Sequence, residues 1–561
     1  MSSNPQTTPM MTGADLTAAA LVQEGVTHVF GLPGTTVMHL IDAFARNDRM
    51  RFISVRHEQV AAFMADGYAR ATGEVGVCMA SRGPGAANLA IGIHNAHAEH
   101  VPVLALVGQV PDSIYYRESF EELDLTNFFS PMTKWQVEIR QTERIPELLQ
   151  RAVRTSSVGR RGAVLVSIPL DVQTAKSAPT LQPQLRVGHP APAPDDVRRA
   201  LDLLQTATRP VAIVGGGLQQ QGYDAAVIDL LEHLQIPVVS TWMRKSVFPN
   251  DSDLFCGSLG YGAFAVTEEL VRDADVVLAL GCRFSEFATK NWTILNPDMS
   301  LIHVDLAEEV IGRVYPAAVG INADAHLFAE SALSVIGMES IEQGRRTHTM
   351  CMRERYLEES ETTVIPADKP GVPSAAIIHA LGEILEEIDP VIVQDAPSLG
   401  TWIQRYLNFI RPARFYAAAG GSMGWGLPAA MGIQLARPSD RVLAVCGDGS
   451  FWMVAQDLET AVREDIPVVV LVNNNFAYGN TRDRQRLAHG ERYSGVFYKN
   501  PDFAAYANLL GAHGERVETS DELLPALRRA FESGRPAIVD VIQNVQEGIP
   551  ADLVPPPAVT G

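Results

Sequence analysis

Cysteine is scarce in this chain, and its spacing indicates no paired chemistry. The 561 residues contain five cysteines, with no CxxC motif among Cys78, Cys256, Cys282, Cys351 and Cys446. Such scatter does not suit a disulfide framework, and several of these residues stand in strand-like apolar runs. We therefore expect buried free thiols in a reducing cytoplasm.

Long apolar runs and positive charge are also lacking. No run approaches the roughly 18 apolar residues that a bilayer span needs. The N-terminal residues MSSNPQTTPMMTGADL contain no apolar stretch of the kind found in signal peptides, so we expect neither a signal peptide nor a membrane anchor. The 45 basic residues are outnumbered by 65 acidic ones, giving a net charge of −20 with no long basic run. This balance argues against nucleic acid as a partner.

What is present is the composition of a soluble globular protein, 46% hydrophobic and 20% charged. The length suits about three domains. Two proline-rich stretches divide the chain, at Ser177 to Asp196 and at the end of Glu342 to Pro373. The predicted divisions are an N-terminal domain at 1–176, a linker at 177–196, a middle domain at 197–340, a linker at 341–373, a C-terminal domain at 374–546 and a tail at 547–561.

Each predicted domain alternates short apolar strands with helical patterns. Predicted strands include 29–31, 52–55, 75–80 and 103–108 in the first domain, 210–217, 237–241, 276–281 and 301–305 in the second, and 391–394, 442–446, 468–472 and 537–542 in the third. This alternation predicts the α/β class, with three doubly wound parallel-sheet domains. The first and last domains are expected to share one architecture around the middle one.

The most informative motif is Gly447-Asp448-Gly449-Ser450, which follows a predicted strand. The next predicted strand, 468–472, ends at three asparagines, Asn473 to Asn475. Because parallel strands present their carboxyl ends at one edge of a sheet, Asp448 and Asn475 are expected to lie close together there. A carboxylate, an amide oxygen and a backbone carbonyl are hard ligands that suit Mg²⁺.

A GDG motif followed by paired asparagines 26 and 27 residues after the aspartate resembles the signature of thiamine diphosphate enzymes. The resemblance implies that Asp448, Asn475 and the carbonyl of Ala477 hold Mg²⁺. It also implies that the turn after Gly447, with Gly449, Ser450 and Ser398, binds the diphosphate of the cofactor.

A second motif, RHE followed by ADGYARATG, places Glu58 in the first turn of a predicted helix. This context resembles acetolactate synthases and related decarboxylases of the thiamine diphosphate family, and the resemblance extends from about Gly13 to Val545. It implies that Glu58 is the catalytic acid beside the aminopyrimidine ring of the cofactor. It also implies sites shared between subunits, hence a homodimer at least and often a tetramer.

The segment AAAGGSMGWGLP supplies a third resemblance. Met423 matches the family position that supports the bent cofactor between its two rings, and Gly421 matches the position whose carbonyl accepts a bond from the pyrimidine amino group. Family chemistry further implies decarboxylation of a 2-oxo acid, followed by release of an aldehyde or by capture of the bound carbon unit by a second carbonyl (carboligation).

Residues for substrate selection are drawn from turns after the predicted strands. The candidates are Thr35, Ser81, Arg82, Gln109, Phe120, Glu121, Lys134, Phe287 and Arg484. Four of them depart from the acetolactate synthase pattern, because Arg82 replaces a usual serine, Glu121 a glutamine, Phe287 an arginine and Arg484 a tryptophan. The basic residues favour an anionic substrate.

Several alternatives stay open. A benzoylformate decarboxylase would carry histidines near Ser81 and Phe287, where this chain has none, and the adjacent histidines of pyruvate decarboxylases are also missing. A simple decarboxylase or carbon–carbon lyase, and a cofactor-binding member without turnover, both remain hypotheses beside the carboligase.

The middle domain raises the question of FAD. Gly215 to Gly217 and Gly257 to Gly262 resemble the flavin-binding region of acetolactate synthases and pyruvate oxidases, but a glycine cluster after a strand is common in α/β domains. We favour a middle domain without flavin. The row His94, His97 and His100 is interpreted as a helix face, because no carboxylate or cysteine cluster accompanies it.

Overall fold

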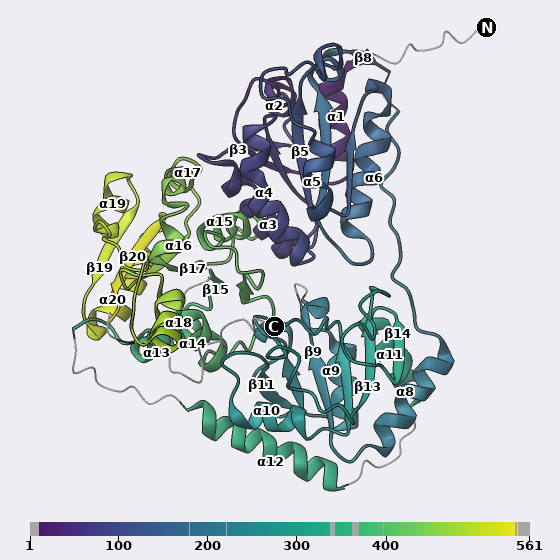
Figure 1. Cartoon of the computed structure of the whole chain (residues 1–561), viewed down its shortest axis with the longest axis vertical. Helices are drawn as coiled ribbons and strands as arrows, with labels where there is room; N and C mark the ends of the chain where they lie inside the picture. Colours follow the sequence, from purple (N-terminus) through teal and green to yellow (C-terminus); the bar gives the residue numbers. More distant parts are fainter. Residues whose placement is uncertain are drawn as a thin grey trace. The chain divides into compact units, whose positions relative to one another are not determined.

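The computed structural model describes residues 10–178, 180–219, 222–336, 343–361, 370–395, 398–544 and 547 (Figure 1). Within these ranges, strands form three six-stranded sheets in which all neighbouring strands run parallel. Helices connect the strands of each sheet. The predicted α/β class with three parallel-sheet domains is therefore confirmed.

The N-terminal sheet has the strand order β3-β2-β4-β5-β7-β6. Its strands are β2 (His28–Gly31), β3 (Arg51–Ser54), β4 (Gly76–Ala80), β5 (Val103–Gln109), β6 (Trp135–Glu138) and β7 (Val164–Pro169). Its helices are α1 (Gly13–Gln23), α2 (Met38–Ala45), α3 (Glu58–Thr72), α4 (Pro84–Ala98), α5 (Leu125–Phe129), α6 (Ile145–Ser157) and α7 (Leu170–Thr174). A short antiparallel pair, β1 (Met11–Thr12) with β8 (Lys176–Ser177), joins the two ends of this part of the chain.

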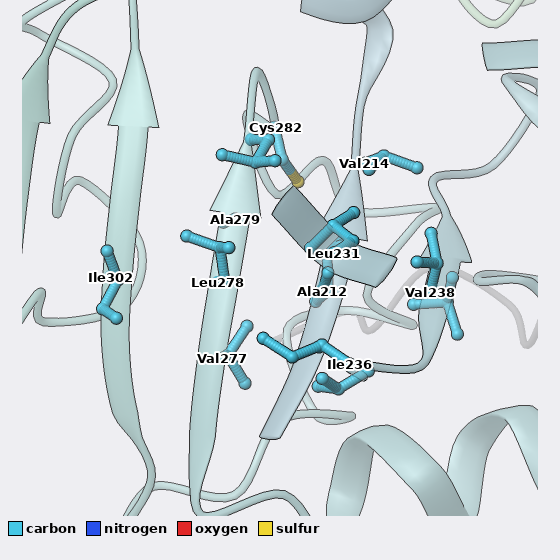
Figure 2. Packing of buried hydrophobic residues seen from close by; sticks show 14 of the residues in the cluster. Ala212, Val214, Leu231, Ile236, Val238, Val277, Leu278, Ala279, Cys282 and Ile302 are labelled. Carbon is cyan, nitrogen blue, oxygen red and sulfur yellow. The ribbon is translucent and has the colours of Figure 1, made fainter. Parts of the chain in front are cut away.

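The middle sheet has the order β11-β10-β9-β12-β13-β14, in which the first strand in sequence lies at the centre. Its strands are β9 (Pro210–Val214), β10 (Val238–Ser240), β11 (Phe255–Ser258), β12 (Val276–Leu280), β13 (Ser300–Asp305) and β14 (Val319–Asn322). Its helices are α8 (Pro194–Thr206), α9 (Ala225–Leu234), α10 (Ala265–Arg272), α11 (Ala325–Val335) and α12 (Gln343–Ser360). Figure 2 shows side chains of β9, β10 and β12 packing together with Leu231 of α9.

The C-terminal sheet has the order β16-β15-β17-β18-β20-β19. Its strands are β15 (Val391–Gln394), β16 (Phe415–Ala417), β17 (Val442–Gly447), β18 (Val469–Asn474), β19 (His513–Val517) and β20 (Ala537–Ile542). Its helices include α13 (Ser374–Glu387), α14 (Leu399–Tyr406), α16 (Asp448–Phe451), α18 (Gly479–His489), α19 (Phe503–Leu509) and α20 (Ser520–Glu532). Numbered from their own first strands, the N-terminal and C-terminal sheets have the same order, as the expected shared architecture requires.

Contacts divide the chain into two compact units. One contains the N-terminal sheet together with Gly420–Ser439 and Met453–Val468, and the other contains the middle and C-terminal sheets. Helices α15 (Gly426–Ala436) and α17 (Leu458–Arg463) therefore belong to the first unit. There α15 packs directly on α3, with Gly67 against the backbone of Ala429 and Gly432 against the backbone of Met64.

Two predicted connectors are only partly covered by the described residues. Between β8 and α8 the described residues form no helix or strand. Residues 362–369 and, except for Glu547, the predicted tail lie outside the described ranges. None of the described helices combines the length and apolar character that a membrane span would need.

Candidate functional site

Glu58 is the first residue of α3, at the carboxyl end of β3 in the N-terminal sheet. His57 precedes it as the N-cap, and its ring nitrogen accepts a hydrogen bond from the Gln59 N–H at 3.2 Å. The Glu58 side chain is only 6% exposed, and its Oε2 accepts a bond from Asn88 Nδ2 at 2.9 Å. Gly85 of α4 lies against Oε1, so a side chain there would crowd the carboxyl group. The fold thus holds a buried acid at the edge where parallel sheets bind ligands.

Two turns meet next to each other at the carboxyl ends of β2 and β4. The Thr36 and Ser81 hydroxyls are 2.8 Å apart, and Gly34 lies against Ser81. Thr35, the residue selected from the sequence, is exposed, whereas its neighbour Thr36 is fully buried. The sequence indicated this turn but did not show that Thr36, and not Thr35, is the buried threonine.

Arg82 lies between this pair of turns and the loop that contains Phe120. Its Nε donates to the Phe120 carbonyl at 2.7 Å, and its guanidinium group lies 3.6 Å from Glu121 and over the Phe120 ring. The Phe120 side chain is 76% exposed, and Glu121 has a φ of +60°, a conformation that most side chains disfavour. Arg82, Phe120 and Glu121 thus form one cluster, with the cation already paired.

Gln109 and Lys134 have different surroundings. Gln109 ends β5, is buried, and donates to the Leu123 carbonyl at 2.9 Å, so it fixes the base of the Phe120 loop. Lys134 precedes β6, where its Nζ donates to the Val158 carbonyl at 3.0 Å. Since β6 runs parallel to β7 and β5, Lys134 lies at the amino edge of the sheet, and the structure does not bring it to the other candidates.

The glycine-rich segment before α15 is anchored by a buried polar network. Trp425 Nε1 donates to Asp66 Oδ1 at 2.8 Å, and Asp66 pairs with Arg70 at 2.6 Å. Upstream of this anchor, Gly421 has a φ of +75° and is exposed, and Met423 is half-buried. Met423, which is predicted to support the bent cofactor, is therefore available to a ligand. Asp66 supports this segment, and the sequence did not single it out.

In the other compact unit, Asp448 lies at the end of β17 with 2% of its surface exposed. Its Oδ1 accepts from the Gly449 N–H at 2.9 Å and from the Tyr498 hydroxyl at 3.0 Å. Its Oδ2 accepts from the Phe476 N–H and from Asn500 Nδ2, both at 2.8 Å. Burial raises the pKa of Asp448 to about 6, although all four donors oppose this shift. A carboxylate that is costly to bury is thus held in one orientation.

The three asparagines at the carboxyl end of β18, Asn473 to Asn475, complete this edge. Asn474 accepts from Asn500 at 2.9 Å, and Asn475 Oδ1 accepts from the Ala477 N–H at 3.1 Å. Asn475 Nδ2 and Ser398 Oγ both lie against Gly479, where a Cβ would be 2.9 and 3.1 Å from them. The structure therefore brings the Ser398 and Asn475 side chains to the same glycine.

Tyr498, Asn500 and Gln543 are site residues that the sequence did not reveal. Gln543 Oε1 accepts from Asn473 at 3.1 Å and Asn475 at 3.3 Å. The Tyr498 hydroxyl lies against Gly449, where a Cβ would lie 2.6 Å from its oxygen. These residues follow the motif by tens of positions with no spacing rule, so only the fold brings them to Asp448.

The residues at this edge fit a hard divalent cation. Ser450 and Ala477 are buried beside Asp448 and Asn475 in sequence, and the Oδ1 atoms of Asn473 and Asn500 are buried with no hydrogen-bond partner among the described residues. Among those residues no group of three or more His, Cys, Asp or Glu side chains gathers to hold a metal. A single carboxylate with amide and carbonyl oxygens is the donor set that suits Mg²⁺ with water and phosphate oxygens.

Phe287 and Arg484 are brought to one aromatic group in the second unit. The Phe287 ring lies 4.8 Å from that of Trp242 and 5.2 Å from that of Tyr261. Burial raises the pKa of Tyr261 above its ordinary value, and the nearby charge of Arg484 opposes this shift. Phe287 and Arg484, which both depart from the acetolactate synthase pattern, therefore both interact with Tyr261.

The glycines that suggested a flavin site have a packing explanation. A Cβ at Gly215 would lie 2.2 Å from the Gly281 carbonyl, and one at Gly217 would lie 2.7 Å from the Gly281 Cα. Backbone contact between the ends of β9 and β12 thus requires small residues without any nucleotide. In the histidine row, His100 Nε2 contacts the Arg160 guanidinium at 2.7 Å, and burial lowers the pKa of His97.

Comparison with known families finds matches in all three parts. Residues 11–128 match the family described as thiamine pyrophosphate enzyme, N-terminal TPP binding domain. Residues 197–332 match the central domain and residues 395–541 the C-terminal TPP binding domain of the same enzymes. Matches therefore cover most of the chain.

Individual relatives are similar along almost their whole length. The chain is 33% identical to a probable acetolactate synthase large subunit of Methanocaldococcus jannaschii, over 97% of this chain and 94% of that protein. It is 32% identical to the acetolactate synthase isozyme 3 large subunit of Escherichia coli K12, over 96% of each. It is 31% identical to the isozyme 2 large subunit of the same organism, over 98% of each.

Proposed function

Since this chain belongs to the thiamine pyrophosphate enzyme family, we propose that it decarboxylates a 2-oxo acid and joins the remaining carbon unit to a second carbonyl compound, as an acetolactate synthase does. The observation that carries the proposal is the buried Asp448 at the end of β17, with Asn475 after the neighbouring strand. Cytoplasmic location and assembly as a homodimer or tetramer belong to the same proposal.

The C-terminal edge is proposed to bind the cofactor. Asp448, Asn475 and the Ala477 carbonyl would hold Mg²⁺, with Gly447 to Ser450 and Ser398 around the diphosphate. The four hydrogen bonds to Asp448 hold both of its oxygens in one orientation before the ion binds. When bound, thiamine diphosphate supplies the carbon nucleophile and the electron sink that decarboxylation requires.

Glu58 is proposed as the acid that exchanges a proton with the cofactor ring. Its buried position in the first turn of α3 excludes water, and Asn88 holds one oxygen while Gly85 leaves room beside the other. Met423 and the Gly421 carbonyl would shape the cofactor from the segment before α15. Arg82, with Thr36 and Ser81 nearby, would meet the carboxylate of the oxo acid at the carboxyl edge of the N-terminal sheet.

A second candidate, release of a free aldehyde, is favoured by the surroundings of Phe287. Packing of this ring with Trp242 and Tyr261 makes apolar the position where acetolactate synthases use an arginine for substrate selection. An apolar, aromatic wall suits a bulkier 2-oxo acid and does not itself recruit a charged acceptor.

The test is CO₂ release with product identification. Purified protein with thiamine diphosphate and Mg²⁺ is given 2-oxo acids from pyruvate to benzoylformate, with and without an aldehyde acceptor. An acyloin or a 2-hydroxy-2-methyl-3-oxo acid supports carboligation, and an aldehyde alone supports the second candidate. No CO₂ from any acid, with the cofactor demonstrably bound, overturns both. Glu58→Gln serves as the control for background decarboxylation.

A further inference from the structure

The turn between β3 and α3, which leads to Glu58, is held by hydrogen bonds and ion pairs to a segment far away in sequence. In the first compact unit, residues 453–468 bind the end of β3 and the start of α3. Arg51 pairs with Glu464 and Arg56 with Glu459, each at 2.8 Å, and Gln59 donates to the Met453 carbonyl at 2.8 Å. These contacts lie on or near the surface of this unit.

Asp457 contributes a fully buried side chain to this row of contacts. Its side chain is 0% exposed, and Oδ1 accepts from the Arg56 N–H and the Thr460 hydroxyl, each at 2.9 Å. Its Oδ2 is buried and has no hydrogen-bond partner among the described residues. Such a group is costly, and native proteins retain few of them without a reason.

The position of Asp457 at the start of α17 shows that its side chain gives up another hydrogen bond to make this contact. Asp457 is the N-cap residue of α17, where an aspartate ordinarily accepts a bond from a backbone N–H of the first turn. Here the side chain makes no such bond and instead reaches the backbone of Arg56. The chain therefore forgoes a helix cap in favour of a contact with another element.

Arg56 determines where α3 begins. It stands directly before His57, the extended N-cap residue, and two residues before Glu58. Fixing the Arg56 N–H fixes the direction in which the chain enters the helix, and hence the position of the Glu58 carboxyl group. Arg56 is also held through its side chain by Glu459, but that pair is half-exposed and weak.

From this geometry we infer that Asp457 is a positioning residue for Glu58, acting through the Arg56 N–H. The inference rests on the proposed function, because it assigns the purpose of the contact to the catalytic acid. Burial raises the pKa of Asp457 to about 6, with the Arg56 and Thr460 bonds opposing the shift and the charge of Glu459 adding to it. The carboxyl group is thus retained at a cost that a purely structural polar residue could avoid.

Three substitutions test the inference. Asp457→Ala removes the acceptor and is expected to lower kcat by about 10- to 100-fold with KM changed by less than about threefold, since small displacements of a reacting group cost this much. Asp457→Asn keeps an oxygen for Arg56 and is expected to recover most of kcat. Glu459→Gln is the matched control, because it removes the side-chain partner of Arg56 but leaves the bond from the Arg56 N–H to Asp457, and its kcat is expected to equal that of the parent.

Two results would overturn the inference. One is a parental kcat in Asp457→Ala, and the other is an Asp457→Asn variant as impaired as Asp457→Ala. If Asp457→Ala does not fold, Asp457→Glu replaces it. That variant keeps the charge but moves the carboxylate by one methylene, and a kcat loss larger than that of Asp457→Asn is expected.

A readout independent of turnover separates this inference from the proposed function. Hydrogen exchange of the Arg56 amide, measured on the full chain without cofactor, is expected to quicken by about 5- to 10-fold in Asp457→Ala, the value of one lost hydrogen bond, and to stay unchanged in Asp457→Asn. Unchanged exchange in Asp457→Ala would overturn the positioning contact. Faster exchange in a protein that decarboxylates no 2-oxo acid would leave the contact standing and overturn the function alone.

Discussion

The N-terminal and C-terminal sheets share one strand order but carry different chemistry after equivalent strands. The third strand of each sheet, β4 or β17, ends in a turn that opens a helix. After β4 the turn places Arg82, which is paired with Glu121. After β17 it places Asp448, which is buried. The shared scaffold decides where ligands meet the protein, and the side chains decide what each edge does.

The two carboxyl groups that are proposed to be functional, Asp448 and Glu58, differ in how many hydrogen bonds they accept. Asp448 accepts four hydrogen bonds, which hold both of its oxygens. Glu58 accepts a bond to one oxygen, from Asn88. A metal ligand benefits from a fixed orientation, whereas an acid that exchanges a proton needs one oxygen left accessible. The comparison predicts that changes at the N-terminal edge alter turnover and that changes at the C-terminal edge alter binding.

The largest effect is expected from Glu58→Gln. Because the amide retains the contact with Asn88 but cannot deliver a proton, kcat should fall by about 10²- to 10⁴-fold. Titration of Mg²⁺ and thiamine diphosphate should give parental affinities. Loss of cofactor affinity without loss of kcat would contradict the assignment of turnover to the N-terminal edge and of binding to the C-terminal edge.

The next largest effect concerns pH and the stability of the cofactor-free chain. The folded pKa of Asp457 is about 6, above its ordinary 3.8, so the folded state keeps a proton that the unfolded chain has already lost. Stability contributed by this group is complete below pH 3.8 and is lost as pH rises through about 6. Asp457→Asn lacks this loss, so its stability advantage over the parent should grow across that window by up to about 3 kcal/mol.

Thermal unfolding of the parent and of Asp457→Asn at several pH values checks this prediction. An advantage of Asp457→Asn that shrinks between pH 4 and 6 would contradict the assigned direction of the pKa shift.

Asp448→Asn should act on the metal. Removing the charge of the proposed ligand is expected to weaken Mg²⁺ affinity by about 100-fold, with kcat largely restored at saturating Mg²⁺. Isothermal titration with Mg²⁺ in the presence of thiamine diphosphate measures the change. Unaltered Mg²⁺ affinity would remove Asp448 from the ligand set, and with it the main support for a metal at this edge.

A smaller change is expected from Tyr498→Phe. This substitution deletes one of four donors to Asp448 and should weaken Mg²⁺ affinity by about tenfold. Tyr478→Phe is the control, since the Tyr478 ring packs against Tyr498 but no described bond joins its hydroxyl to Asp448. Equal effects of both substitutions would point to ring packing as the cause.

Much of the fold followed from the sequence because central parallel strands are continuous apolar runs. The predicted strands 75–80, 103–108 and 442–446 match β4, β5 and β17 closely. The strands that were missed include the central β7 (VLVSIP) and, at sheet edges, β6 (WQVE), β16 (FYA) and β19 (HGERV). An edge strand pairs on one side only and tolerates polar or very short sequences, so its pattern resembles that of a loop.

The residues of the candidate site also fall into two groups, those that the sequence indicated and those that it did not. Asp448, Asn475 and Ser398 could be proposed from the sequence because local motifs place them just after predicted strands. Tyr498, Asn500 and Asp457 were not indicated by the sequence, because their contacts join residues that are tens or hundreds of positions apart. Lys134 was grouped with the substrate candidates on its sequence context, but the direction of β6 places it at the opposite edge of the sheet.

The packing of α15 on α3 has a consequence for how freely this sequence can vary. Gly67 and Gly432 each touch the backbone of the facing helix, where a methyl group would lie within 2.3 and 2.1 Å of a carbonyl oxygen. No rotamer change can relieve an overlap with backbone. A complete survey of single substitutions should therefore find these two positions among the least tolerant in the chain, although neither bears a functional group.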